Sequence, residues 1–323
     1  MSSEYLLETI NLSKHFSESK SLFNWNPKSV KAVNNVNIKV KPKEVLGLVG
    51  ESGCGKSTLG RTILRLLPAT SGKILYKGDD ILKYNNKQMF ELRKKMQIIF
   101  QDVYSSLNPR MTVGDIVTAP LNVFKEGDKK YRQNKVIEML EEVGLRAQYL
   151  NRFPHEFSGG QRQRIVIARS LIMNPELVIC DEPVSALDVS VRAQVLNLMK
   201  RLKEEKGLTY IFISHDLSVV NHISDRIAVM YLGNVIELAE RDELFKNAFH
   251  PYTKALLSAV PIASTETRKN RIILKGDIPN PYDPPKGCCF NTRCPKVTQR
   301  CREEIPELKT LASDHLCACF YPD

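Results

Sequence analysis

The sequence predicts an α/β protein in which helices cover both faces of a parallel β-sheet. Four short segments are apolar almost throughout, as strands buried on both faces are: residues 45–49, 97–100, 177–180 and 210–214. Val195, Leu198 and Leu202 recur at helical spacing between the last two segments, which indicates an amphipathic helix. Strands that alternate with helices along the chain are typical of the α/β class.

The composition is that of a globular protein. The 323 residues are 42% hydrophobic and 26% charged, which favours one large domain or two modest ones and excludes a disordered chain. No segment approaches the ~18 uncharged apolar residues that a membrane span needs. The N-terminus has no basic head leading into an apolar block, so we expect no secretory signal and a cytosolic chain.

The net charge favours an anionic partner. Lys and Arg number 47 against 36 Asp and Glu, which gives +11. Such an excess suits nucleic acid, a nucleotide or an acidic membrane face. A solvated basic surface without a dedicated partner is the alternative.

The strongest motif follows the segment predicted as a strand at 45–49. Residues 50–57 (GESGCGKS) fit the pattern G-x-x-x-x-G-K-[ST], between a strand and a helix as that pattern requires. Glycines let backbone N–H groups wrap a triphosphate, while Lys56 supplies a cation and the Ser57 hydroxyl is placed to bind Mg²⁺. The residues predicted to bind nucleotide here are Gly50, Ser52, Gly53, Cys54, Gly55, Lys56, Ser57 and Thr58.

A pair of carboxylates ends the apolar segment at 177–180. Acid pairs at strand ends are common, but beside a phosphate-binding loop this pair gains a specific chemistry. Asp181 would hold Mg²⁺ through water, and Glu182 would polarise the attacking water. The two motifs together predict hydrolysis of a nucleoside triphosphate.

A second phosphate-binding turn lies in residues 157–161 (FSGGQ), before a long helical pattern. One phosphate group does not need two such turns from one chain. Here the sequence resembles the ATP-binding-cassette (ABC) family, in which this signature turn closes over the ATP held by a partner subunit. Phe157 replaces the commoner leucine. The resemblance assigns four residues to the partner's ATP: Ser158, Gly159, Gly160 and Gln161.

Four further positions match the same family in its order. The resemblance implies that Phe16 stacks on adenine, although an ordinary strand aromatic is the alternative. It implies that Gln101 reaches metal and water, so that Ser57, Gln101 and Asp181 are the expected Mg²⁺ residues. It also implies that Asp188 crosses a dimer interface and that His215 senses the γ-phosphate, which makes Glu182, His215 and Gln101 the expected catalytic set.

The family resemblance implies a P-loop ATP-binding cassette with a RecA-like core, an antiparallel β subdomain and a helical subdomain at about 102–170. We expect the nucleotide-binding domain to span 1–255 and a Cys- and Pro-rich extension to span 256–323. Nine of the 17 prolines lie in the last 73 residues, which supports that boundary. Residues 20–30, with the single tryptophan Trp25, are expected to form an insertion loop.

Several loops are similar to those of oligopeptide and dipeptide importer ATPases, and the Trp25 segment and the tail point to the F-type subunits of that group. The motifs are SSLNPR at 105–110, PHEF at 154–157, CDEPVSALD at 180–188 and HPYT at 250–253. This resemblance implies a type-I importer ATPase that is peripheral to the cytoplasmic face of the membrane. Its implied partners are a second ATPase, two permeases and an external peptide-binding protein.

Other functions are open from the residues alone. The same kind of ATPase could energise the import of dipeptides, nickel or glutathione. A soluble ABC ATPase acting on nucleic acid or ribosomes would suit the +11 charge, but proteins of that kind usually carry two cassettes or a long coiled coil, and neither is present.

Six of the eight cysteines lie between residues 288 and 319. A small Pro-rich segment gains stability from a metal, and disulfides are disfavoured in a reducing cytosol. The spacing C-x5-C-x6-C-x17-C resembles the tails of peptide-importer ATPases, in some of which the thiolates hold a [4Fe-4S] cluster. The implied ligands are Cys288, Cys294, Cys301 and Cys319, with zinc or free thiols as alternatives.

Overall fold

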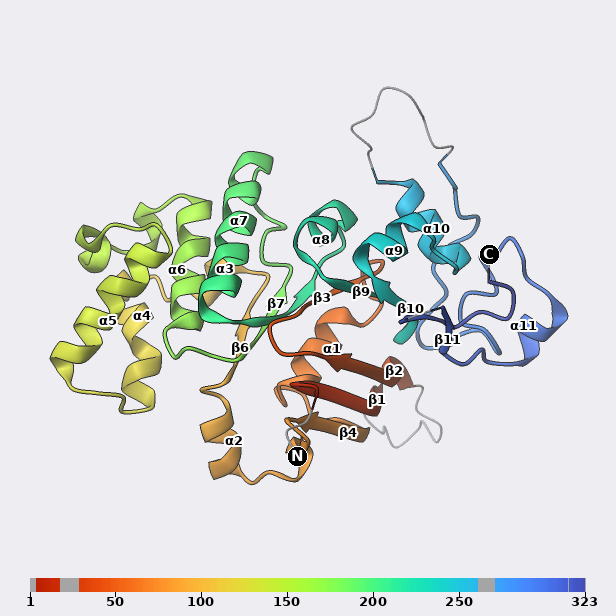
Figure 1. Ribbon diagram of the computed structural model, residues 1–323, viewed down its shortest axis with the longest axis horizontal. Helices are drawn as coiled ribbons and strands as arrows, with labels where there is room; N and C mark the ends of the chain where they lie inside the picture. The colour runs from red at the N-terminus through yellow and green to blue at the C-terminus, as the bar shows by residue number, and fades with distance from the viewer. Residues whose placement is uncertain (1–3, 18–28, 261–270, 313, 323) are drawn as a thin grey trace, which may run out of the picture. The chain divides into compact units, whose positions relative to one another are not determined.

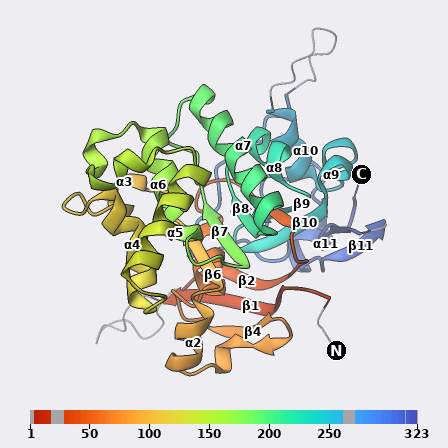
Figure 2. The ribbon, with the colours of Figure 1, turned by 60° about the vertical axis from the view of Figure 1, so that its left-hand side comes forward.

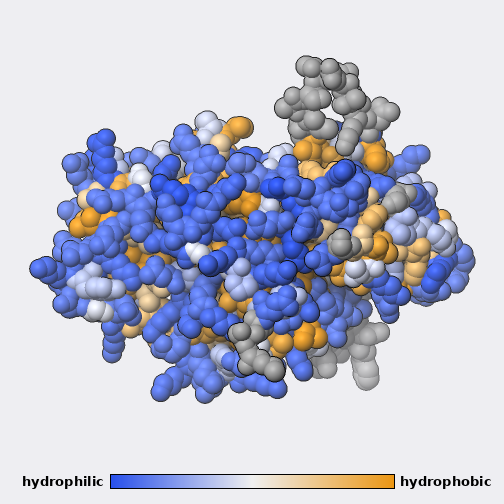
Figure 3. Space-filling view, in the orientation of Figure 1, coloured by the Kyte–Doolittle hydropathy of each residue, from blue (hydrophilic) through white to orange (hydrophobic). Residues whose placement is uncertain are grey.

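The computed structural model describes residues 4–17, 29–260, 271–312 and 314–322 (Figure 1). The chain forms two compact units, Met1–Lys83 with Ser214–Asp323, and Tyr84–Ile213. In the described part of the chain, every helix is too short or too polar to span a bilayer. Hydrophilic residues cover most of the face shown in Figure 3, where the apolar patches are small and scattered.

The first unit contains the antiparallel sheet that the family resemblance implied. Its strand order is β2-β1-β4-β5, and Figures 1 and 2 both show β2, β1 and β4 side by side. Leu7 pairs with Val40 on one side and with Tyr76 on the other, and all three side chains are buried. The strands are β1 (Leu7–Ser17), β2 (Ser29–Val40), β4 (Ser71–Tyr76) and β5 (Asp79–Asp80), and the short helix η1 (Ile81–Lys83) follows.

The prediction of an insertion loop at 20–30 is wrong for its last two residues. Residues 20–28, including Trp25, lie outside the described residues. Ser29 and Val30 belong to β2 instead, because they pair with Ser17 and Phe16 of β1.

A second sheet of the same unit contains β3 (Val45–Val49), which is parallel to β9 (Arg226–Tyr231). All five residues of β3 are buried, as their apolar character predicted. The sheet continues in the order β9-β10-β12-β11 through antiparallel pairs. The further elements of this unit are β10 (Asn234–Glu240), β11 (Lys309–Ala312), β12 (His315–Cys317), α1 (Lys56–Ile63), α8 (Leu217–Ile223), α9 (Arg241–Lys246), α10 (Pro251–Ser258) and α11 (Gln299–Glu303).

The second unit contains three parallel strands in the order β6-β7-β8. They are β6 (Met96–Ile99), β7 (Leu177–Asp181) and β8 (Thr209–Ile213). The predicted strands at 97–100 and 210–214 were each one residue too late, and the one at 177–180 ended one residue early. The physical reason is that backbone pairing, which ends at Ile99–Cys180 and Asp181–Ile213, sets the strand ends rather than apolar character.

The predicted amphipathic helix is α7 (Val189–Lys206), in which Val195, Leu198 and Leu202 are buried. Residues 102–157 contain helices and no strand, as predicted. In this segment α4 and α5 pack against each other and against α6. The helices of the unit, besides α7, are α2 (Asn86–Leu92), α3 (Val103–Ser106), α4 (Val113–Val123), α5 (Lys129–Glu142), η2 (Ala147–Asn151), η3 (Pro154–Glu156) and α6 (Gly159–Leu171).

The C-terminal segment is tied to the second sheet of the first unit. β12 pairs with β10, so that Cys317 lies opposite Glu237. The Nε2 atom of His315 lies 2.8 Å from Oε1 of Glu237, and both side chains are fully buried. The Glu237 carboxylate also accepts hydrogen bonds from the backbone N–H groups of Phe249 and His250. The sequence predicted neither strand, so the tail is more integrated than expected.

Candidate functional site

The phosphate-binding loop joins the buried strand β3 to the start of α1. A Cβ atom on Gly55 would lie 1.9 Å from the backbone oxygen of Ala32, and φ of Gly55 is +106°, so glycine is required there. Gly55 is also the N-cap of α1 and supplies no side-chain cap. The first N–H groups of this helix, with the positive end of its dipole, therefore form an anion-binding turn.

Lys56 places its ammonium group inside this loop. Its Nζ atom donates hydrogen bonds to the backbone oxygens of Gly50 at 2.7 Å and Glu51 at 3.0 Å. The residue is 5% exposed, so the loop surrounds the charge. Burial raises the pKa of the neighbouring Cys54 thiol, so that thiol stays protonated at neutral pH and adds no negative charge to the loop.

In the second unit, Asp181 and Glu182 lie at the end of β7. Asp181 is 1% exposed. Glu182 has a φ of +48°, and its backbone N–H donates to the oxygen of Ile213 at 3.0 Å. A side chain in this left-handed region costs about 1–3 kcal/mol, and such strain is common at functional sites.

The structure brings Gln101 and Glu182 together, although 81 positions separate them in sequence. The amide Nε2 of Gln101 donates a hydrogen bond to Oε2 of Glu182 at 2.8 Å. Gln101 follows β6 and Glu182 follows β7, and these two strands are parallel neighbours. A carboxylate oriented by an amide donor suits a group that positions or deprotonates water.

The signature turn forms the start of α6. Ser158 is its N-cap: its Oγ accepts from the backbone N–H of Gln161 at 3.4 Å, and the Gln161 side chain accepts from the N–H of Ser158 at 3.1 Å. This reciprocal pair is a capping box. A Cβ on Gly160 would lie 2.3 Å from Cγ1 of Val191, so glycine lets α6 and α7 approach closely. The predicted turn at a helix start is present, and its role toward a phosphate stays a prediction.

Three further predicted residues lie on the surface of their own units. Phe16 in β1 is 42% exposed, with Lys14 Nζ 4.9 Å from its ring centroid. His215 follows β8 and is exposed, in the first unit. Asp188 is exposed at the N-cap of α7, in the second unit, and its side chain makes no capping hydrogen bond. The sequence roles of these three residues stay predictions.

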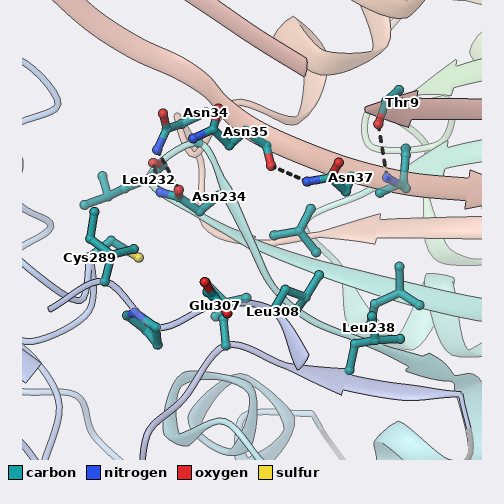
Figure 4. Close-up of a pocket in the computed structure, with 18 of the residues that line it drawn as sticks. Thr9, Asn34, Asn35, Asn37, Leu232, Asn234, Leu238, Cys289, Glu307 and Leu308 are labelled. Atoms are coloured by element: carbon teal, nitrogen blue, oxygen red, sulfur yellow. Dashed lines mark hydrogen bonds between the residues drawn. The ribbon is translucent and has the colours of Figure 1, made fainter. Parts of the chain in front are cut away.

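A large cavity of the first unit, about 900 Å³, lies mostly away from the phosphate-binding loop (Figure 4). Its polar wall includes Asn34, whose Nδ2 donates to Oδ1 of Asn234 at 2.9 Å. Leu308 of the C-terminal segment lies on the opposite side. Gly53 is the single residue of the loop among its described lining residues, so the cavity is not the phosphate site.

The four predicted cysteine ligands line one small cavity of about 10 Å³. Such a volume is about that of a single water site, so a metal cluster would require the four side chains to move apart. All eight cysteines are free thiols. Among the described residues, no group of three or more His, Cys, Asp or Glu side chains is arranged to hold a metal ion. The fold brings the four predicted ligands together, but their arrangement gives no evidence that a metal binds there.

The thiols of this cluster differ in acidity. A hydrogen bond with Cys289 lowers the pKa of Cys288, and His250 lowers it further. Burial raises the pKa values of Cys294 and Cys319. Of these three thiols, Cys288 is therefore the most acidic, and a thiolate is the form that iron or zinc binds.

Comparison with known families gives two matches. The family model described as "ABC transporter" matches residues 33–185. The model described as "Oligopeptide/dipeptide transporter, C-terminal region" matches residues 236–301. The phosphate-binding loop with Lys56 and the signature turn both lie in the first matched region. The first four of the six clustered cysteines, Cys288 to Cys301, lie in the second.

Curated proteins resemble nearly the whole chain. The oligopeptide transport ATP-binding protein AppF of Bacillus subtilis is 52% identical over 98% of this chain and 97% of its own length. The dipeptide transport ATP-binding protein DppF of Haemophilus influenzae is 52% identical over the same shares. The oligopeptide transport ATP-binding protein OppF of Haemophilus influenzae is 50% identical over 98% of this chain and 97% of its own length.

Solved structures share the fold. The cbiO1 protein of Clostridium perfringens, part of the ABC transporter complex cbiONQ, has a TM-score of 0.66 at 28% identity, over 76% of this chain and 92% of that one. The ATP-binding cassette MJ0796, solved as a dimer with ADP and phosphate, has a TM-score of 0.64 at 28% identity, over 73% of this chain and 98% of that one.

The close approach of α6 and α7 generates a prediction. Replacing Gly160 with alanine should lower the free energy of unfolding by about 1–3 kcal/mol, because the new methyl group overlaps Val191. Urea denaturation followed by circular dichroism measures the change. Gly159→Ala is the matched control, since its Cβ would meet its nearest neighbour, Leu187, at an ordinary 3.6 Å.

A second substitution, Val191→Ala, removes the overlapping atom and should restore most of the stability lost in Gly160→Ala. Equal stability of the two glycine variants would contradict this account of the signature turn.

Proposed function

Because the chain belongs to the ATP-binding proteins of oligopeptide and dipeptide ABC transporters, we propose that it energises the import of oligopeptides across the cytoplasmic membrane. It is an ABC transporter ATPase, and the P-loop ABC fold expected from its motifs is confirmed. The observation that carries the proposal is the presence of both matched regions in one chain that aligns with its relatives over 98% of its length. Dipeptides are the alternative cargo, because the relatives named for either cargo are equally similar, at 52%.

We propose the following roles at the phosphates. The backbone N–H groups of the loop and the Lys56 ammonium bind the β- and γ-phosphates of ATP, and Phe16 stacks on adenine. Ser57, Gln101 and Asp181 offer hydroxyl, amide and carboxylate oxygens, which are the ligands that Mg²⁺ prefers. When bound there, Mg²⁺ would neutralise charge that develops on the phosphates.

Glu182 is proposed as the group that takes a proton from the attacking water, and His215 as a further catalytic residue near the γ-phosphate. The hydrogen bond from Gln101 supports this role, because it fixes the orientation of the Glu182 carboxylate. The left-handed backbone at Glu182 supports it as well. These assignments are proposals for individual residues within a family whose ATPase activity is established.

The signature turn and Asp188 are proposed to serve the ATP of a second, homologous ATPase subunit. The position of Ser158 supports this, since this exposed residue lies at the start of α6, where the positive end of the helix dipole favours an anion. MJ0796 was solved as a dimer, which is consistent with the same arrangement. Two permeases and an external peptide-binding protein would complete the transporter, with this chain at the cytoplasmic face. The division into a domain at 1–255, with its helical part at 102–170, and an extension at 256–323 is part of the same proposal.

Changing Glu182 to glutamine should leave ATP binding intact and reduce turnover at least ~10²-fold, because the amide cannot accept a proton. Equilibrium binding of a fluorescent ATP analogue and release of phosphate measure the two effects separately. Glu205→Gln on the exposed face of α7 is the control and should hydrolyse ATP normally. Rapid turnover by the Glu182 variant would remove this residue from the proposed role.

Uptake of labelled peptides tests the cargo. Cells that lack this chain should fail to accumulate a pentapeptide, and the wild-type gene should restore uptake whereas the Glu182→Gln form should not. A parallel assay with a dipeptide distinguishes the two peptide classes. Normal pentapeptide uptake in the deletion strain would overturn the oligopeptide assignment.

The cysteine cluster carries a second proposal, a [4Fe-4S] cluster on Cys288, Cys294, Cys301 and Cys319. The convergence of four thiols on one cavity supports it, and a cluster takes four such ligands. The small cavity and the lack of a preformed metal group in the described residues count against it. No step of ATP hydrolysis is assigned to this group.

Anaerobic purification followed by iron and sulfide analysis tests the cluster. We expect ~4 of each per chain, a brown colour, and loss of both in Cys301→Ser. Cys317→Ala, outside the spacing pattern, is the control that should keep its iron. A colourless, iron-free wild-type protein would exclude the cluster.

A further inference from the structure

The C-terminal segment makes an ion pair with the phosphate-binding loop. The Nη1 and Nη2 atoms of Arg293 donate to the two carboxylate oxygens of Glu51 at 2.7 and 3.1 Å. The Arg293 side chain is 8% exposed and that of Glu51 is 25% exposed. A two-pronged pair of this kind has a fixed geometry, and its partial burial strengthens it relative to a surface pair. The two residues are 242 positions apart, and both lie in the first unit.

Glu51 is the second residue of the loop, and it is held at three points. Its backbone N–H donates to the hydroxyl of Tyr252 at 2.9 Å. Its backbone oxygen accepts from the Lys56 ammonium at 3.0 Å. Its carboxylate is held by Arg293. Arg293 therefore holds the side chain of the same residue whose backbone oxygen accepts from Lys56.

Arg293 is itself held by a buried aromatic group. Phe290, three residues earlier, is fully buried and packs edge-to-face against Tyr231 and Tyr252, with ring centroids 5.3 and 5.5 Å away. The backbone N–H of Arg293 donates to the oxygen of Phe290 at 3.1 Å. Tyr252 belongs to both groups of contacts, because it packs on Phe290 and binds the backbone of Glu51. The arginine therefore reaches the loop from a fixed base.

The charges explain why this contact matters for an anion. Glu51 places a carboxylate beside a loop whose proposed ligand is a triphosphate, and an unpaired carboxylate there would repel it. The guanidinium of Arg293 neutralises that carboxylate, and the hydrogen bonds to Glu51 raise the pKa of Arg293, so the arginine stays charged at every physiological pH.

We propose that Arg293 is a positioning residue for the phosphate-binding loop: through Glu51 it fixes the loop and cancels its negative charge, and so sets the affinity for ATP. This inference rests on the proposed role of residues 50–57 in binding ATP. It gives the C-terminal segment a direct effect on the nucleotide site, which no sequence motif indicated.

The test is a double-mutant cycle in the full-length chain. Arg293→Gln removes the cation, Glu51→Gln removes the carboxylate, and a third protein carries both changes. Equilibrium titration with a fluorescent ATP analogue gives the dissociation constant of each. We expect Arg293→Gln to weaken binding about tenfold, which is about 1.4 kcal/mol, and to have no further effect in the Glu51→Gln background.

Two further variants separate positioning from folding. Arg300→Gln breaks an exposed ion pair with Glu304 in the same segment and should bind ATP like the wild type. Arg293→Lys keeps the charge but loses the two-pronged geometry, so it should recover part of the affinity. Urea denaturation without nucleotide reports on folding in all variants.

The outcomes are distinct. A wild-type dissociation constant in Arg293→Gln, or the same loss in both Glu51 backgrounds, would overturn the inference while leaving the proposed function intact. A fall in stability with unchanged affinity would assign Arg293 a structural role alone, and would overturn it as well. Failure of the wild-type chain to bind the analogue would instead refute the nucleotide role of the loop.

Discussion

The close approach of backbone to backbone around the phosphate-binding loop is the constraint on which the first unit depends. A Cβ on Gly50 would lie 2.3 Å from the oxygen of Met230, and one on Gly55 would lie 1.9 Å from that of Ala32. The N–H of Gly233 also donates to the oxygen of Cys54 at 2.9 Å. Segments from β2 and from the β9–β10 turn thus enclose the loop, and side chains at these glycines would force them apart. The loop keeps its shape because distant parts of the chain hold it.

The C-terminal segment extends this enclosure rather than standing apart from it. β12 continues the sheet that contains β3, and the buried pair of His315 and Glu237 ties the end of the chain to β10. Removing either partner would leave a buried polar group without its hydrogen bond, which costs about 1–3 kcal/mol, so this contact helps to hold the end of the chain. Arg293 then lies on a stable support when it contacts Glu51. Residues distant in sequence therefore hold both the backbone of the loop, through close contacts at its glycines, and its Glu51 side chain, through Arg293.

The local parts of this architecture were predictable, and the long-range contacts were not. Residues 50–57 and 157–161 were found because a short spacing fixes their backbone and chemistry, and β3 because its five residues are all apolar. The contact of Arg293 with Glu51 and that of His315 with Glu237 join positions 242 and 78 apart. No spacing rule relates such residues, since the sheet order that brings them together depends on the whole unit. The sequence placed Gln101 in the same site as Glu182 by family order, but the hydrogen bond between them came from the structure.

In the second unit, the proposed chemistry lies where three parallel strands end. Gln101 follows β6, Glu182 follows β7, and Ile213 is the last residue of β8. Because parallel strands present their carboxyl ends at one edge, each strand contributes one partner: the amide that orients the carboxylate, the carboxylate itself, and the backbone oxygen that holds its N–H. The left-handed backbone of Glu182 is compatible with folding because the contacts on both sides offset its strain. The register of β6, β7 and β8 therefore sets the direction of the proposed base, and a shift by one residue in any of them would turn it away.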